Sequence, residues 1–193
     1  MFENALALRK VSFGKKIAAK TAVSLLVIAL AVALPQIVHI ALGQPGGVKW
    51  LPMYLPVLIG GCLLGPVWGA GVGILSPAVS FLITSAFHNP MPPAVRLPFM
   101  MAELFVFGLV SGLFSKMIAR HPLMAFPAVI LAQIAGRGAF LGLVAIFGNM
   151  TVLKVPMIWD QIIAGIPGIV VQAVAVPLIV IALRALMLRG EKE

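Results

Sequence analysis

Acidic residues and cysteines are both scarce in this chain. The 193 residues include five Asp and Glu residues against fourteen Lys and Arg residues, and Cys62 is the single cysteine. One cysteine excludes an internal disulfide and a multi-cysteine metal site. Charged residues make up 10% of the sequence, whereas water-soluble domains typically have about 25%, so a soluble globular class is excluded.

Motifs of catalytic chemistry are missing as well. The sequence has no GxxxxGKS/T phosphate-binding loop, so we expect the chain not to hydrolyse ATP by itself. Its histidines and carboxylates show no spacing typical of a protein metal site, and we predict neither a metal nor a bound cofactor. No internal repeat is evident, which argues against an inverted-repeat transporter. We therefore expect a protein that is not an enzyme.

Apolar residues dominate what is present. They make up 62% of the chain, and the mean hydropathy of +1.13 places it among integral membrane proteins. The net charge of +9 is compatible with nucleic-acid binding, but basic residues cluster before the first hydrophobic segment, which is typical of a topology signal. We expect no nucleic-acid partner. The sequence divides into a basic cytoplasmic segment (1–16), a membrane domain (17–188) and a cytoplasmic tail (189–193).

The longest uncharged stretch runs from Trp50 to Phe87 and contains no Asp, Glu, Lys, Arg or His. A helix needs about 20 residues to cross the ~30 Å hydrocarbon layer, so this stretch predicts two crossings. Gly65-Pro66 lies near its middle, where we predict a tight turn because Pro cannot continue a helix. The fold class that we predict is an all-α membrane protein of six transmembrane helices, at about 17–42, 52–64, 67–86, 96–119, 123–147 and 159–186, with loops at 43–47, 87–95 and 148–156.

Basic residues are distributed unequally between the two ends of these helices. Ten lie in or next to the N-terminal segment, the loop between the fourth and fifth helices, and the C-terminal tail, whereas Lys49, Arg96 and Lys154 lie on the other side. Basic residues favour the cytoplasmic side, so we expect both termini to be cytoplasmic. The first apolar run, Ile17 to Ala41, is longer than the core of a cleaved signal peptide, and we expect a retained helix.

Two charged residues fall well inside predicted helices. Arg137 lies near the middle of the fifth helix, and Glu103 lies about two turns into the fourth. An ionisable group inside the bilayer is costly, about 3 kcal/mol on insertion scales, so each is a functional hypothesis. Their opposite charges predict either a structural ion pair between the two helices or an anchor for a substrate, and both roles can coexist.

Polar and aromatic residues gather at the predicted outer ends of the helices. Rings at that depth are typical of the aromatic belt, but beside proline-rich loops they also suit a pocket for a flat organic molecule. For His39, a hydrogen-bonded interface residue is the alternative to a ligand contact. In addition to Glu103 and Arg137, the substrate-binding residues that we predict are His39, Trp50, Tyr54, Met91, Asn149, Trp159 and Asp160.

Small residues four positions apart mark one face of the first predicted helix. Ala18 and Ala22 form such a pair in its cytoplasmic half. Small residues let membrane helices approach each other closely. This spacing is common by chance in an Ala-rich helix, so by itself it indicates little.

Two segments resemble a known family. LPMYLPVLIGGCLLGPVWGAGVGILSPAVSFLIT, followed by MPPAVRLPFMMAELFVFGLVSGL, is similar to the substrate-binding S component of energy-coupling factor (ECF) transporters. The similarity extends from about His39 to Gly142. Its most specific features are the Gly65-Pro66 turn, combined with Ser76-Pro77, and the Met91-Pro92 loop.

The resemblance implies a six-helix binding subunit in the plasma membrane of a prokaryote. Such proteins capture a vitamin or related micronutrient on the outer side, associate with a membrane coupling subunit and two cytoplasmic ATPases, and topple within the bilayer to release the ligand inside. Ala18 and Ala22 match the family's AxxxA docking feature. Substrate identity does not follow: the chain has no clear match to the riboflavin, thiamin, biotin or folate subtypes, and cobalamin precursors, pantothenate and lipoate stay open.

The residues alone are compatible with three other functions. A solitary small-molecule carrier would work without ATPases. A small membrane enzyme would need a nucleophile, a base or a metal constellation, whereas the predicted helices hold only Glu103 and Arg137 as an acid–base pair. A purely structural subunit is disfavoured by the cost of burying these two charges.

Overall fold

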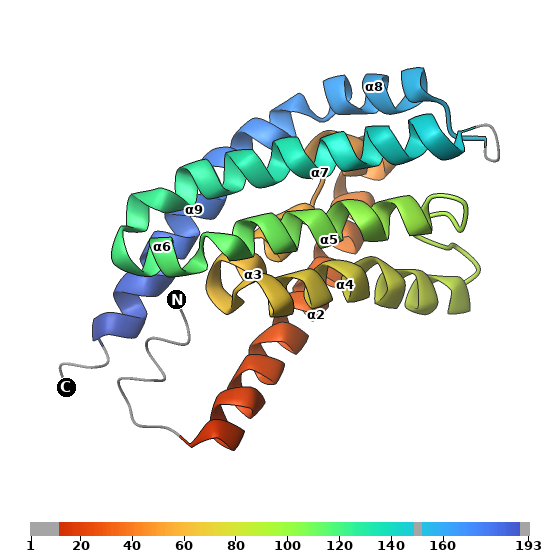
Figure 1. The fold of residues 1–193 in the computed structure, drawn as a ribbon. Helices are drawn as coiled ribbons and strands as arrows, with labels where there is room; N and C mark the ends of the chain where they lie inside the picture. Colours follow the sequence, from red (N-terminus) through yellow and green to blue (C-terminus); the bar gives the residue numbers. More distant parts are fainter. Residues whose placement is uncertain (1–11, 149–151, 190–193) are drawn as a thin grey trace.

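The computed structural model describes residues 12–148 and 152–189, and within these ranges it is a bundle of helices without strands (Figure 1). Five of the described helices are long and apolar enough to cross a membrane, and Leu97–Leu113 is a shorter apolar helix. The predicted all-α membrane class is confirmed. In chain order the elements are α2 (Phe13–Trp50), α3 (Tyr54–Leu64), α4 (Pro66–Ala86), α5 (Leu97–Leu113), α6 (Ser115–Arg120), the 3-10 helix η1 (Pro122–Met124), α7 (Ala125–Phe147), α8 (Val155–Ala164) and α9 (Ile166–Arg189).

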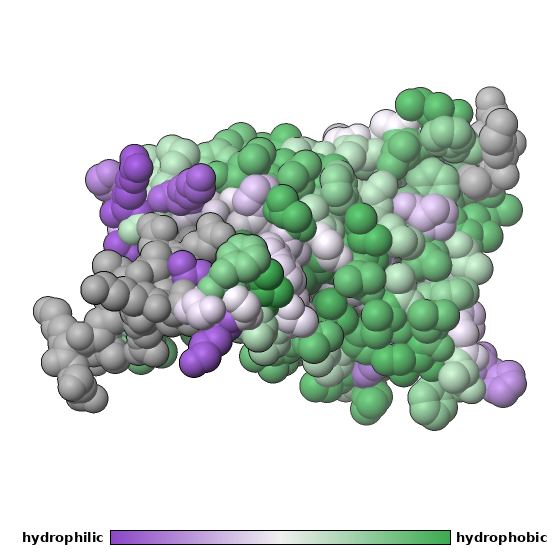
Figure 2. All heavy atoms as spheres, turned by 60° about the horizontal axis from the view of Figure 1, so that its bottom comes forward, coloured by the Kyte–Doolittle hydropathy of each residue, from purple (hydrophilic) through white to green (hydrophobic). Residues whose placement is uncertain are grey.

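The bundle has two distinct ends. The start of α2, the end of α9, the α3–α4 turn, α6 and η1 lie at one end, on the left in Figure 1, which we call the α6 end. The α4–α5 loop and the start of α8 lie at the opposite end. In Figure 2, the surface between the two ends is largely hydrophobic, and hydrophilic side chains gather at the left, the α6 end. This distribution is the one that a multi-pass membrane protein needs.

The turn predicted at Gly65-Pro66 is confirmed. Gly65 caps both α3 and α4 and adopts φ 92° and ψ 178°, a backbone conformation that side chains with a Cβ rarely adopt. Pro66 follows as the first residue of α4, where its missing N–H costs nothing. Together the two residues reverse the chain direction between two buried apolar helices.

The loop predicted at 43–47 is wrong. Helical structure continues from α2 to Trp50, and the chain changes direction at Gly43, whose φ of 68° and ψ of −172° are non-helical. Pro45 lies two residues further, in the first turn of the resumed helix, where Pro is tolerated. The reversal into α3 comes later, at Leu51, which adopts a left-handed conformation.

Two of the predicted helices are interrupted. The fourth, predicted at 96–119, ends at Leu113 and restarts as the short α6. The sixth, predicted at 159–186, is divided at Gly165 into α8 and α9. Pro167 is the second residue of α9, a position where Pro fits the first turn although it would disrupt a continuous helix. Hydropathy conceals the break at Gly165 because the sequence on each side is apolar.

Buried glutamines provide partners for backbone carbonyls near these breaks. The Nε2 of Gln172 donates hydrogen bonds to the carbonyls of Trp50 (3.1 Å) and Leu51 (2.9 Å), where α2 ends. Gln133 Nε2 donates to the carbonyl of Ile169 (3.2 Å), in the first turn of α9. Irregular backbone inside a membrane persists only where protein groups satisfy it in this way.

Helices α4 and α5 pack with their backbones in contact. A Cβ added at Gly69 would collide with the backbone of Gly108 and Gly61, and one added at Gly73 would collide with the carbonyl of Leu104. Gly69 and Gly73 are four residues apart and therefore share one face of α4. Close approach through small residues is the usual way for membrane helices to associate, because lipid provides no hydrophobic drive.

We expect Gly69→Ala to destabilise the protein by about 1–3 kcal/mol, the usual cost of overpacking, because the colliding atoms belong to backbone and cannot move aside easily. Gly71→Ala is the matched control, since a Cβ at this neighbouring position of α4 meets nothing within 4 Å. Thermal unfolding of the two variants in the same detergent measures the difference. Equal melting temperatures would contradict the close packing of α4 on α5.

Candidate functional site

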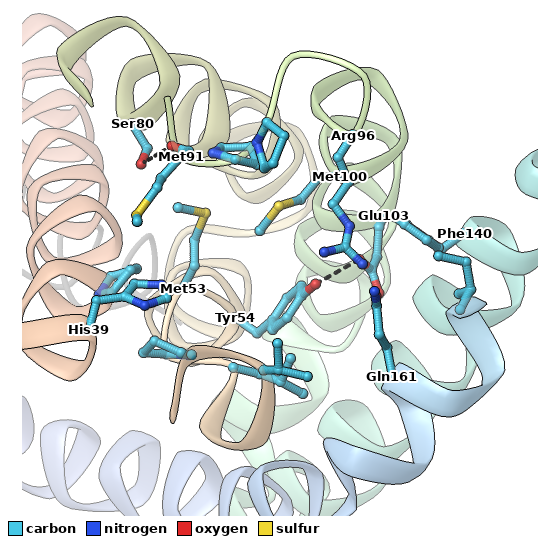
Figure 3. A pocket seen from close by; sticks show the side chains of 18 of the residues that line it. His39, Met53, Tyr54, Ser80, Met91, Arg96, Met100, Glu103, Phe140 and Gln161 are labelled. Carbon is cyan, nitrogen blue, oxygen red and sulfur yellow. Dashed lines mark hydrogen bonds between the residues drawn. The ribbon is translucent and has the colours of Figure 1, made fainter. Parts of the chain in front are cut away.

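A cavity of about 170 Å³ lies at the end of the bundle opposite α6. Residues from α2, α3, α4, α5, α7 and α8, together with the α4–α5 loop, form its walls. Most of these side chains are apolar, and a small number of polar and charged groups point inward among them (Figure 3). This composition is typical of pockets for small organic molecules.

Glu103 is the centre of the polar wall. Its side chain is completely buried, and its two oxygens accept separate hydrogen bonds. Oε1 accepts from Nη1 of Arg137 at 2.8 Å, and Oε2 accepts from the hydroxyl of Tyr54 at 2.8 Å. Glu103, Arg137 and Tyr54 come from α5, α7 and α3. The two hydrogen bonds of Glu103 therefore join three separate helices at the cavity.

Aromatic contacts fix Arg137 and Tyr54 further. The guanidinium of Arg137 lies over the ring of Tyr54, 4.7 Å from its centroid, which is a cation–π geometry. The Tyr54 ring meets Phe107 edge-on, with the ring centroids 5.1 Å apart. Arg137 is therefore held by a carboxylate and by a ring face at once, although its buried Nε has no hydrogen-bond partner within the described residues.

Arg96 is a second arginine at the cavity. It is the residue directly before α5, and its side chain extends toward Tyr54 and Glu103 (Figure 3). Among the residues that the structure describes, the guanidinium of Arg96 makes neither a hydrogen bond nor an ion pair. Arg96, Met100 and Glu103 follow one another at i, i+4 and i+7, so they share the face of α5 that lines the cavity.

Three methionines form the adaptable part of the wall. Met53, Met91 and Met100 come from the start of α3, the α4–α5 loop and α5, and their side chains converge on the same space (Figure 3). Thioether side chains fit irregular apolar shapes and make favourable contacts with aromatic rings. This wall is suited to the uncharged body of an organic ligand.

Hydrogen bonds from α4 position Met91. Its backbone N–H donates to Thr84 Oγ1 at 2.7 Å, and its carbonyl accepts from Ser80 Oγ at 2.8 Å. The peptide bond from Met91 to Pro92 is cis. The α4–α5 loop is thereby attached to α4 where it covers the cavity.

The structure gathers five of the predicted substrate-binding residues around the cavity and leaves three outside it. His39, Tyr54, Met91, Glu103 and Arg137 line it. Substrate binding by these residues stays a prediction. Trp50, Trp159 and Asp160 do not line it, and Asn149 lies outside the described residues.

The orientation of α8 accounts for two of the three residues outside the cavity. Ile158 and Gln161 are three positions apart and both line the cavity. Trp159 and Asp160 lie between them on the helix and are exposed, Trp159 by 54%. Trp50, 37% exposed, contributes its backbone carbonyl to Gln172 instead.

Sequence reasoning missed several residues of the cavity. Arg96 and Met100 lie seven and three residues before Glu103, a helical spacing that could have placed them on the same face. Phe140 lies three residues after Arg137 and could have been found in the same way. From the sequence, Arg96 counted only among the basic residues on the side opposite the termini. No comparable signal pointed to Met53 and Gln161, because their inward direction depends on how α3 and α8 are rotated.

Ala18 and Ala22 are far from the cavity, near the α6 end of α2. Both are exposed, and Ala29 and Ala33 continue the same exposed side of this helix. The described part of the chain therefore leaves this small-residue face uncovered. Docking at this face stays a prediction.

Comparison with known proteins identifies the family. Residues 20–184 match the family model described as "ECF transporter, substrate-specific component". The chain belongs to this family. The search of curated proteins and the search of solved structures gave no match. The S component is thus a multi-pass membrane subunit with substrate specificity, and the cavity around Glu103 is the place in the described structure best suited to a small molecule.

We expect Arg137→Met to destabilise the S component by about 3–5 kcal/mol, because it leaves the carboxylate of Glu103 buried without its counter-charge. Adding Glu103→Gln should recover a large part of this loss, since the double variant buries no uncompensated charge at this pair. Thermal unfolding in detergent measures both effects.

The exposed Arg120 provides the control, because Arg120→Met removes the same charge at the α6 end without uncovering a buried partner. If Arg137→Met were as stable as Arg120→Met, the ion pair would have no structural role.

Proposed function

We propose that this S component captures a vitamin or a related cofactor precursor at the outer face of a prokaryotic plasma membrane. Its partners in this proposal are a membrane coupling subunit and two cytoplasmic ATPases of an ECF-type ABC importer, which carry out ATP hydrolysis and deliver the substrate inward. The observation that carries the proposal is a cavity with convergent polar groups in a chain of this family.

The distribution of charge supports the direction of capture. Basic residues at the α6 end include Lys116 and Arg120 on α6 and Arg184 on α9, and basic residues favour the cytoplasmic side. The cavity lies at the opposite end, between α2, α5 and α8. With the α6 end in the cytoplasm, the cavity faces outward, as a subunit that collects substrate from outside requires.

The exposed alanine face of α2 supports the proposed association with a coupling subunit. Ala18 and Ala22 present small side chains near the α6 end, where a partner helix can approach closely. This face is separate from the cavity, so binding of substrate and binding of the partner are expected to be separable by mutation.

Filling the cavity is expected to abolish substrate binding. Met100→Trp places a large ring among Met53, Met91 and Tyr54. We expect a substrate to co-purify with the wild-type protein and to be lost from this variant. Mass spectrometry of the denatured, purified protein measures it. Met117→Trp, at an exposed position of α6, is the matched control and should retain the molecule. Equal recovery from both variants would place the substrate elsewhere.

Enlarging the alanine face is expected to abolish association with the partner without affecting substrate binding. Ala18→Trp and Ala22→Trp should each reduce co-purification of the coupling subunit by at least about tenfold, because an indole prevents close helix approach. Ala182→Trp, an exposed alanine of α9, serves as the control. Uptake by the S component alone in liposomes, without the coupling subunit and ATPases, would overturn the proposed mechanism in favour of a solitary carrier.

A further inference from the structure

The charges around the cavity do not balance. Arg96 and Arg137 both line it, whereas Glu103 is the one carboxylate among its lining residues in the described structure. Glu103 accepts two hydrogen bonds, from Arg137 and Tyr54, and donates none, which is the pattern of an ionised carboxylate. Glu103 forms its ion pair with Arg137, and the charge of Arg96 also acts on this carboxylate. Two arginines against one carboxylate leave one positive charge in excess.

No other acidic side chain of the described structure compensates Arg96. Asp160 belongs to α8 at the same end of the bundle, but it is exposed and does not line the cavity. It also makes no ion pair with Arg96. Arg96 is half-buried at the end of a helix, where a long cationic side chain can reach water, so its guanidinium is available to an anionic group of a ligand. The site thus holds one positive charge more than it holds negative charges.

The residues near Arg96 indicate what kind of ligand would fit the rest of the cavity. Beyond the charged groups, Met53, Met91 and Met100 present an uncharged and deformable wall (Figure 3). A partner that fills this space has an apolar or aromatic body and a single acidic group at one end. Free inorganic anions lack such a body.

We propose that the substrate is an organic monocarboxylate whose carboxylate binds Arg96 and whose uncharged body lies against Met53, Met91 and Met100. The proposal rests on the proposed function, and it names the substrate class of the same cavity. A carboxylate restores charge balance, whereas a phosphate monoester brings close to two negative charges at neutral pH. The planar guanidinium also matches the two oxygens of a carboxylate.

Binding of matched ligand pairs to the purified S component tests the proposal. Each pair consists of a carboxylate and a neutral molecule of nearly the same shape: benzoate and benzamide, pantothenate and panthenol, lipoate and lipoamide. Titration calorimetry in detergent measures the affinities. We expect at least one carboxylate to bind about 10- to 100-fold more tightly than its neutral partner, the value of a hydrogen bond to a charged group.

Two variants test whether Arg96 causes the preference for the carboxylate over its neutral partner. Arg96→Gln should reduce the preference for the carboxylate to about threefold or less, because it removes the charge, whereas Arg96→Lys should keep part of it. Neither substitution breaks a side-chain hydrogen bond or ion pair of the described structure, and Arg96→Lys also keeps the charge that acts on Glu103, so Arg96→Lys should unfold at the wild-type temperature. Arg120→Gln, at the α6 end, should keep the full preference.

The outcomes separate this inference from the proposed function. If every neutral molecule bound as tightly as its carboxylate, or if Arg96→Gln kept the preference, the monocarboxylate assignment would be overturned while the proposed function stood. If none of the carboxylates bound, the inference would also be overturned, because every carboxylate small enough to enter gains the contact with Arg96. Uptake without ATPases would overturn the proposed mechanism and leave the ligand preference intact.

Discussion

The ion pair between Glu103 and Arg137 is the constraint on which the site depends. Each charge alone would be costly inside the membrane, so the two helices that carry them, α5 and α7, are stabilised where the charges meet at 2.8 Å. Tyr54 extends the constraint to α3 through its hydrogen bond to the second carboxylate oxygen. One side of the cavity is therefore held by three helices that are distant in sequence.

Hydrogen bonds and close helix packing hold the hairpin of α4 and α5 at its two ends. Gly69 and Gly108 bring the two backbones into contact at the end that is opposite the α4–α5 loop. Ser80 and Thr84 then attach the backbone of Met91 to α4. The same hairpin thus carries Met91 and Arg96 at the edge of the cavity, with Glu103 deeper along α5.

Sequence patterns predicted the turn whose local signal is strong, and they missed or misplaced the interruptions within apolar segments. The turn at Gly65-Pro66 was predictable because two residues with special backbone properties interrupt a stretch too long for one crossing. The change of direction at Gly43 was misplaced because Gly and Pro indicate a break without specifying whether the chain turns back or continues as a helix. The break at Gly165 was missed because hydrophobic residues continue on both sides.

The sequence by itself determined that the chain is an all-α membrane protein, where its charges are concentrated, and that Glu103 and Arg137 need partners. These properties follow from composition and local spacing, which do not depend on how helices are arranged. Only the tertiary structure decided that Gln161 faces the cavity while its neighbour Asp160 is exposed, and that Arg96 belongs to the site. The direction of a side chain depends on how its helix is rotated against the others. Packing between distant segments sets that rotation.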